Sequence, residues 1–198
     1  MRLVETTRFR RGRLPHWEIK NGRYFVTVRL ADSLPSPIVS RLQEIHRALS
    51  AIAPASDQFA TLQRQYFRTM EKYLDAGTGA CLLRDAAHAA TVRSELLALE
   101  EWNVAAPHFT IMPNHWHALL VPALGCAHSL VEIMKRVKGR TGLGIRAVTK
   151  TSGALWQREW FDRWMRDDYE WEKTVAYIRN NPVKAGLAAT WQEHRWTQ

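Results

Sequence analysis

Two histidines separated by one residue, His115 and His117, are the side chains of this sequence whose spacing best suits metal chemistry. The run from 115 to 121 alternates in character and favours a β-strand, where residues i and i+2 project from the same face. Both imidazoles would then point one way and Trp116 the other. Convergent imidazoles form a half-site for a divalent metal ion, although two surface histidines can also alternate by chance.

Tyr177 is the second residue of interest. Its segment favours a helix that Pro182 should end near Asn180 or Asn181. Asn181 lies four residues after Tyr177 and therefore shares its helical face. Taken alone, such a tyrosine is more often a packing residue, and an asparagine before a proline is more often a helix cap.

The elements that must position these residues follow from hydrophobic periodicity and turn residues. Strands are expected at 24–30, 108–112, 115–121 and 160–165, and helices at 38–53, 57–74, 86–102, 130–145 and 168–181. With the helical insertion after the first strand set aside, the order of the core elements is βαββαβ. This order predicts an α+β fold in which an antiparallel sheet carries helices on one face, the ferredoxin-like arrangement.

The chain length of 198 residues suits one domain with a proper core. Within it we expect a basic N-terminal arm at 1–21, a helical insertion after the first strand at 54–101 and a tail at 188–198. The chain opens without a signal-peptide pattern, has no apolar run of membrane-spanning length, and contains two cysteines with no metal-binding spacing. A cytoplasmic protein without a membrane partner is therefore expected.

The charge points to a polyanionic partner. Lys and Arg number 28 against 19 Asp and Glu, which gives a formal net charge of +9. Candidate DNA contacts are Arg8, Arg10, Arg11, Arg13, His16 and Trp17 in the N-terminal arm, and Lys135, Arg136, Lys138 and Arg140 on a later helix. The alternative for each charge run is a solvated surface.

Ordered motifs give the histidine pair and the tyrosine a common context. The sequence MPNHWH at 112–117 resembles a signature of the small IS-type tyrosine transposases, which are single-tyrosine HUH nucleases. The segments at 156–163 (WQREWFDR) and 177–187 (YIRNNPVKAGL) resemble two further motifs of that family. The early segments 14–17 and 24–27 resemble its branch of REP-associated tyrosine transposases, which act on repetitive extragenic palindromes.

The resemblance implies a mechanism and a substrate. Tyr177 would attack a phosphate of single-stranded hairpin DNA and keep the 5′ end as a phosphotyrosine. His115 and His117 would hold Mg²⁺ or Mn²⁺, with Asn181 as the third protein ligand. The expected activity is a sequence- and structure-specific DNA endonuclease and strand transferase, as in transposition and recombination, associated with the nucleoid. Both a homodimer and a monomer are left open.

Two other functions fit parts of the pattern. A non-catalytic hairpin DNA-binding protein retained by its host would share the charge and the fold. A metal hydrolase acting on small molecules would share the histidine pair, but the excess of basic residues argues against it.

Overall fold

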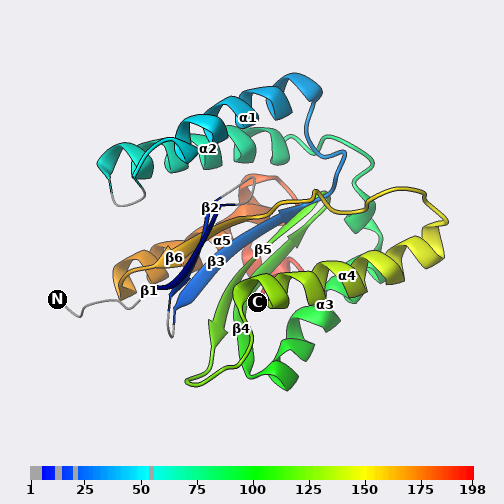
Figure 1. The fold of residues 1–198 in the computed structure, drawn as a ribbon. Coiled ribbons are helices and arrows are strands. Elements are labelled where there is room, and N and C mark those ends of the chain that lie inside the picture. Colours follow the sequence, from blue (N-terminus) through cyan, green and yellow to red (C-terminus); the bar gives the residue numbers. More distant parts are fainter. Residues whose placement is uncertain (1–5, 12–14, 20–21, 54–55) are drawn as a thin grey trace.

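The computed structural model describes residues 6–11, 15–19, 22–53 and 56–198. Its centre is a four-stranded sheet with helices on both faces (Figure 1). The strands are β3 (Arg23–Arg29), β4 (Val104–Met112), β5 (His115–Pro122) and β6 (Phe161–Met165). The predicted α+β class with an antiparallel sheet is confirmed.

The strand order is β4-β5-β3-β6, and each neighbouring pair is antiparallel. This is the ferredoxin-like order, because the first strand of the βαββαβ unit lies between its third and fourth. Thr27 of β3 and Thr110 of β4 both pair with His117. The second histidine therefore lies on a central strand, with a hydrogen-bonded neighbour on either side.

One face of the sheet packs against α3 (Ala86–Leu97) and α4 (Leu130–Thr149). The Asp85 side chain caps α3, and Ser129 with Glu132 forms a capping box at the start of α4. Short 3₁₀ turns at Leu82–Arg84 and Ala98–Trp102 flank α3. These two helices share one face, as the βαββαβ order predicts, and Trp116 is fully buried beneath them.

The opposite face carries α1 (Ser36–Ser50), α2 (Asp57–Leu74) and α5 (Asp168–Lys184). Figure 1 shows α1 beside α2, apart from the pair formed by α3 and α4. The core on this side contains Phe25, Leu119 and Phe161 from three different strands. The sequence pattern did not predict helices on this face. Helices cover this second face because the β-pleat directs alternate apolar residues of the strands toward it as well.

Three segments differ from the expected organisation. Within 54–101, α2 and α3 do not form one unit, because α2 packs on α1 and α3 on α4. The N-terminal arm contains an antiparallel hairpin, β1 (Thr6–Arg11) with β2 (Pro15–Ile19). The C-terminal tail forms a 3₁₀ turn at Trp191–Glu193 and then bonds to the β4 edge through Ile111 N–H to Trp196 O.

Helix α5 was expected to stop before Pro182 but continues to Lys184. Pro182 has no N–H to donate to the preceding turn, so the helix loses one backbone hydrogen bond there. Residues after the proline nevertheless form backbone hydrogen bonds that continue the helical turn. Ala185 N–H donates to Asn181 O, and Leu187 N–H donates to Pro182 O. Gly186 then ends the helix with a positive φ of 67°. None of the helices in the described ranges has the length and apolarity needed to cross a membrane.

Candidate active site

The two imidazoles converge on one point beneath α2 and α5. His115 Nε2 and His117 Nε2 are 3.1 Å apart, and both side chains are fully buried. His115 Nδ1 lies 2.7 Å from Asn114 Oδ1, while the Asn114 amide group donates to backbone oxygens of Leu74 and Thr78. Because Asn114 Oδ1 can only accept, His115 Nδ1 carries the proton, and its unprotonated Nε2 faces His117 as an acceptor or a metal ligand.

His117 is fixed from the neighbouring strand. Its Nδ1 lies 2.8 Å from Thr27 Oγ1, and its ring stacks on Phe25 at a centroid distance of 5.4 Å. Hydrogen bonds to the outer nitrogen are the usual way in which a protein orients a metal-binding histidine. Both histidines thus present Nε2 to the same space, as the strand periodicity predicts.

Tyr177 reaches this point from α5. Its hydroxyl oxygen is 3.3 Å from His117 Nε2. Its ring packs edge-on against Phe25 and Phe67, at centroid distances of 5.8 and 5.7 Å. The fold therefore brings together the three side chains that the sequence singled out from segments 60 residues apart.

Glu71 of α2 completes the cluster, and the sequence analysis did not identify it. Its carboxylate Oε2 accepts a hydrogen bond from the Tyr177 hydroxyl and lies 3.6 Å from His117 Nε2. Among the described residues, Glu71, His115 and His117 form a group whose potential ligand atoms all lie within 4.8 Å of one another. A sequence signal did exist, because Glu71 occupies a helical position on the same face as the apolar Phe67 and Leu74.

The electrostatics of the cluster favour a bound cation. Burial, followed by the neighbouring charge of His117, lowers the pKa of His115 to about 3. Burial alone would raise the pKa of Glu71, but His117, His115 and the Tyr177 hydroxyl outweigh it and hold this pKa at about 2. At neutral pH the site thus contains the buried Glu71 carboxylate beside the neutral His115 imidazole. The second oxygen of this carboxylate, Glu71 Oε1, makes no hydrogen bond among the described residues.

The donor set fits a divalent ion. Two imidazole nitrogens held by one ion at about 2.1 Å each are roughly 3 Å apart, close to the observed separation. The unpaired Glu71 Oε1 adds an oxygen ligand, and oxygen with imidazole ligands suits Mn²⁺ somewhat better than Mg²⁺.

Asn181, the expected third ligand, is buried one turn beyond Tyr177 with an exposed fraction of 2%. Neither of its amide atoms makes a hydrogen bond of ordinary geometry with the described residues. Its amide lies close enough to the Tyr177 hydroxyl to act to lower the pKa of that group, and an amide buried without a well-formed hydrogen bond is costly, so Asn181 is suited to bind a metal ion. The structure thus offers two candidates for the third ligand, Glu71 and Asn181.

A basic pocket of about 260 Å³ opens beside Tyr177, between α2, β6 and α5. Five cationic side chains line it: Arg64, Arg68, Arg163, Arg166 and Lys173. One acid, Glu170, also lines it and pairs with Arg163 at 2.5 Å. No sequence motif indicates this surface, because its cations come from three separate segments and form no run.

The predicted contacts on α4 lie on the other face of the sheet. Arg136 bonds to Glu101 at 2.7 Å and stacks on Trp102, and Arg140 lies 3.5 Å from Glu95. Lys135 is exposed and lines a separate pocket of about 890 Å³. These residues are not brought to the histidine–tyrosine cluster.

Lys138 is engaged within the protein. Its ammonium donates to the backbone oxygens of Gln157 and Arg158 at 2.8 and 2.6 Å. Burial lowers the pKa of Lys138 from its ordinary value of 10.5 to about 8. Lys138 therefore anchors the segment that leads into β6.

This pKa makes a prediction about stability. Between pH 8 and 10.5 the unfolded chain keeps the Lys138 proton that the folded chain has released, so this group makes the free energy of unfolding rise with pH. The slope approaches about 1.4 kcal/mol per pH unit. Urea unfolding at several pH values should show a steeper rise for the wild type than for Lys138→Met. Lys135→Met, at an exposed position of the same helix, should keep the wild-type slope, and equal slopes in all three proteins would contradict the prediction.

The N-terminal candidates are only partly described. Arg8, Arg10 and Arg11 lie on β1, and His16 and Trp17 lie on β2, which pairs with it. Arg13 lies outside the described residues. Contacts between β2 and β6 place the hairpin beside the edge strand of the sheet (Figure 1). Their roles toward DNA remain predictions.

Comparisons with known proteins agree with this geometry. Residues 87–181 match the family model described as "Transposase IS200 like", a stretch that contains both histidines, Tyr177 and Asn181. The structure of a REP-associated tyrosine transposase bound to a REP hairpin has a similar fold. Its TM-score is 0.53 at 15% identity, over 96% of this chain and 81% of that chain.

A candidate transposase from Deinococcus radiodurans R1 matches at a TM-score of 0.32 and 12% identity, over 80% of this chain and 89% of that one. That score is too low to support an argument. No curated protein sequence matches this chain. The resemblance to the IS-type transposases expected from the sequence motifs is nevertheless confirmed by the match of residues 87–181 to the family model.

Proposed function

We propose that this protein cleaves and rejoins single-stranded DNA through Tyr177, in a reaction that depends on a divalent metal ion. The observation that carries the proposal is the position of the Tyr177 hydroxyl. It lies 3.3 Å from His117 Nε2, beside the 3.1 Å histidine pair and at the edge of a basic pocket. A candidate nucleophile, candidate metal ligands and basic side chains suited to phosphates thus lie close together, which supports phosphoryl transfer as the reaction.

The substrate we propose is DNA that folds into a hairpin with a single-stranded flank. The support is the shared fold with the hairpin-bound REP-associated tyrosine transposase, together with the early motifs that resemble this branch. The pocket beside Tyr177 carries five cationic side chains and one acid, a suitable balance for the backbone phosphates of the strand to be cut.

The proposed reaction begins with the Tyr177 oxygen attacking the scissile phosphorus. The bond to the 3′ oxygen of the leaving strand breaks, and a 5′-phosphotyrosine forms. Glu71 Oε2, which accepts the hydrogen bond of the Tyr177 hydroxyl, receives its proton. The leaving strand departs as a 3′ hydroxyl. A 3′ hydroxyl can later attack the phosphotyrosine in reverse, because the ester conserves the energy of the phosphodiester.

The chain's own residues prepare this step. Burial, followed by the negative charge of Glu71, raises the pKa of Tyr177, so its phenol stays protonated until substrate and metal ion bind. Phe25 and Phe67 hold the ring in place. His115, His117 and Glu71 or Asn181 would hold the ion. When bound, a divalent ion neutralises charge on the phosphate and on the attacking oxygen.

To test the proposal, the protein is incubated with labelled hairpin DNA that carries single-stranded flanks and is taken from repeats beside its own gene. Parallel samples contain Mn²⁺, Mg²⁺ or EDTA. We expect a covalent protein–DNA adduct on a denaturing gel with metal and none with EDTA. Proteolysis and mass spectrometry should locate the nucleotide on the peptide containing Tyr177. Tight hairpin binding without cleavage under any metal would instead establish the non-catalytic DNA-binding function.

A further inference from the structure

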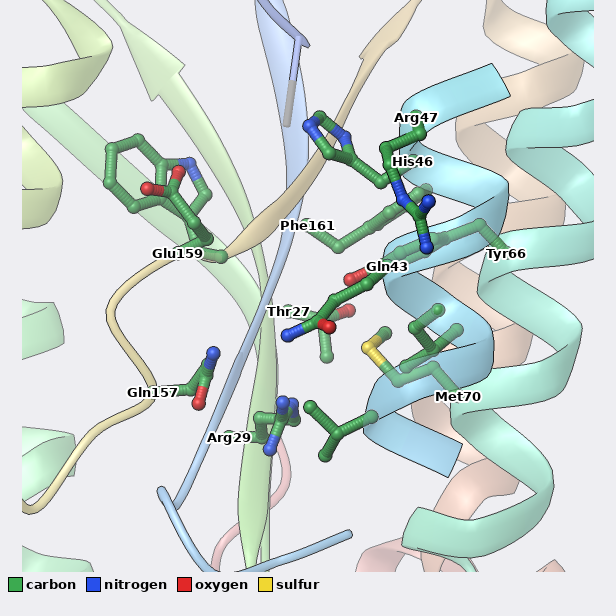
Figure 2. A pocket seen from close by; sticks show the side chains of 13 residues that line it. Thr27, Arg29, Gln43, His46, Arg47, Tyr66, Met70, Gln157, Glu159 and Phe161 are labelled. Carbon is green, nitrogen blue, oxygen red and sulfur yellow. The ribbon is translucent and has the colours of Figure 1, made fainter. Parts of the chain in front are cut away.

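A third pocket, of about 320 Å³, lies next to the cluster but contains none of its proposed catalytic or metal-binding residues. It is bounded by α1, α2, β3 and the segment that leads into β6 (Figure 2). Gln43 and Arg47 of α1 are exposed, so the pocket opens to solvent along this helix. Its volume is at the lower end of the range for small-molecule sites, roughly 300–1,000 Å³.

The pocket contains a buried cation without an acidic partner. Arg29 has an exposed fraction of 5%, and its Nη1 donates weakly, at 3.3 Å, to Leu30 O and Ser33 Oγ. Its Nε and Nη2 groups make no hydrogen bond, and no carboxylate pairs with it, among the described residues. Burial lowers the pKa of Arg29, which reflects the cost of holding this charge away from water. A buried guanidinium that keeps free donors and has no carboxylate partner is therefore expected to serve a ligand.

The remaining lining combines flat apolar surface and neutral amides with three charged or titratable side chains, Glu159, Arg47 and His46. Figure 2 shows Gln43 and Gln157 reaching into the space above Arg29, with Phe161 and Tyr66 at its far end. Amide groups can pair with the polar edge of a nucleobase, and aromatic or apolar side chains can cover its faces. Guanidinium donors match the acceptor edge of a base, most often that of guanine.

The pocket is coupled to the active site through shared residues. Thr27 lines the pocket and its Oγ1 lies 2.8 Å from His117 Nδ1. Phe161 lines both this pocket and the basic pocket that contains Tyr177. Met70 lines it as well and directly precedes Glu71. A strand whose phosphate lies at Tyr177 can therefore place a neighbouring base across Phe161 and into this space.

We propose that this pocket receives one unstacked nucleobase of the single-stranded flank next to the scissile phosphate, with its acceptor edge toward Arg29. The proposal rests on the proposed DNA-cleaving function and adds a sequence-reading subsite to it. One base of the flank is then specified by side chains of β3, α1 and the segment before β6.

The test is an abasic scan. Hairpin DNAs in which each flank nucleotide in turn lacks its base are titrated against the protein by fluorescence anisotropy, in EDTA so that no cleavage occurs. One position should weaken binding by roughly 10- to 100-fold. Arg29→Met should weaken binding of the intact DNA by a similar factor and add little at that abasic position, since both changes remove the same contact. At all other positions the two losses should multiply.

Two controls separate binding from folding. Arg29→Met should melt at the wild-type temperature or above it, because the buried charge has no acidic partner to lose. Gln43→Ala, at an exposed position, should weaken binding of the intact DNA by a smaller factor than Arg29→Met. It should likewise add little at the sensitive abasic position. Arg41→Met removes an exposed cation of α1 outside the pocket and should weaken all DNAs equally and slightly.

The outcomes distinguish the two proposals. Losses that multiply at every position, or no position sensitive to base removal, would overturn the pocket even if the covalent adduct forms. A single coupled position without any adduct would support the pocket and overturn the cleavage reaction. Failure to bind every DNA tested would overturn both.

Discussion

Replacing Tyr177 by phenylalanine is expected to abolish the covalent DNA adduct and to lower cleavage by at least about a thousandfold. The phenyl ring keeps its contacts with Phe25 and Phe67, so the fold and DNA binding should persist. Only the hydroxyl between Glu71 and His117 disappears. Single-turnover cleavage on denaturing gels measures the first effect, and anisotropy with uncleaved hairpin DNA measures the second.

The matched control is Tyr169→Phe on the same helix. Tyr169 is 67% exposed and lies eight residues before Tyr177, away from the cluster. The Tyr169→Phe protein should cleave DNA at the wild-type rate. If Tyr177→Phe still formed adducts, another side chain would be the nucleophile and the proposed reaction would be wrong.

Mn²⁺ is expected to stabilise the protein, and the two histidines should carry that effect. An ion at a hundred times its Kd adds about 2.7 kcal/mol to the free energy of unfolding. For a chain of this size the melting temperature should rise by about 5–10 °C. In the His115→Gln and His117→Gln variants this rise should vanish, and cleavage should fall together with it. Thermal melts with Mn²⁺ and with EDTA measure the shift without any DNA.

His108→Gln serves as the control, because His108 lies on β4 outside the cluster and should leave the Mn²⁺ shift unchanged. Two further variants assign the third ligand. Glu71→Gln should remove most of the shift if the carboxylate binds the ion, and Asn181→Ala should do so if the amide does. If the variant with both His115→Gln and His117→Gln kept the full Mn²⁺-induced rise in melting temperature, the ion would bind elsewhere and the proposed metal site would be wrong.

The predictions from sequence were most accurate where neighbouring residues decide the structure. The alternation around His115 and His117 predicted a strand with both imidazoles on one face, and β5 has this arrangement. The helix over 57–74 was predicted with its observed bounds, since Ser56 caps it and its apolar period is regular. The end of α5 was predicted too early, because the helix continues two residues past Pro182 and is closed by backbone hydrogen bonds from Ala185 and Leu187.

The tertiary structure decided which distant segments meet. Glu71 is 44 residues before His115 in the chain, and only the packing of α2 over the sheet brings its carboxylate to the histidines. The same packing gathers the cations beside Tyr177 and encloses Arg29, whereas Arg136 and Lys138 are occupied by contacts on the opposite face.

By itself, the sequence determined the strand and helix periods, the common face of the histidine pair and the resemblance to the IS200-like transposases, because these depend on local spacing and ordered motifs. Only the tertiary structure decided the acidic third member of the cluster, the basic pocket and the buried arginine without a carboxylate partner. Local periodicity fixes which face of an element a side chain occupies, but the packing of whole elements fixes what that face meets.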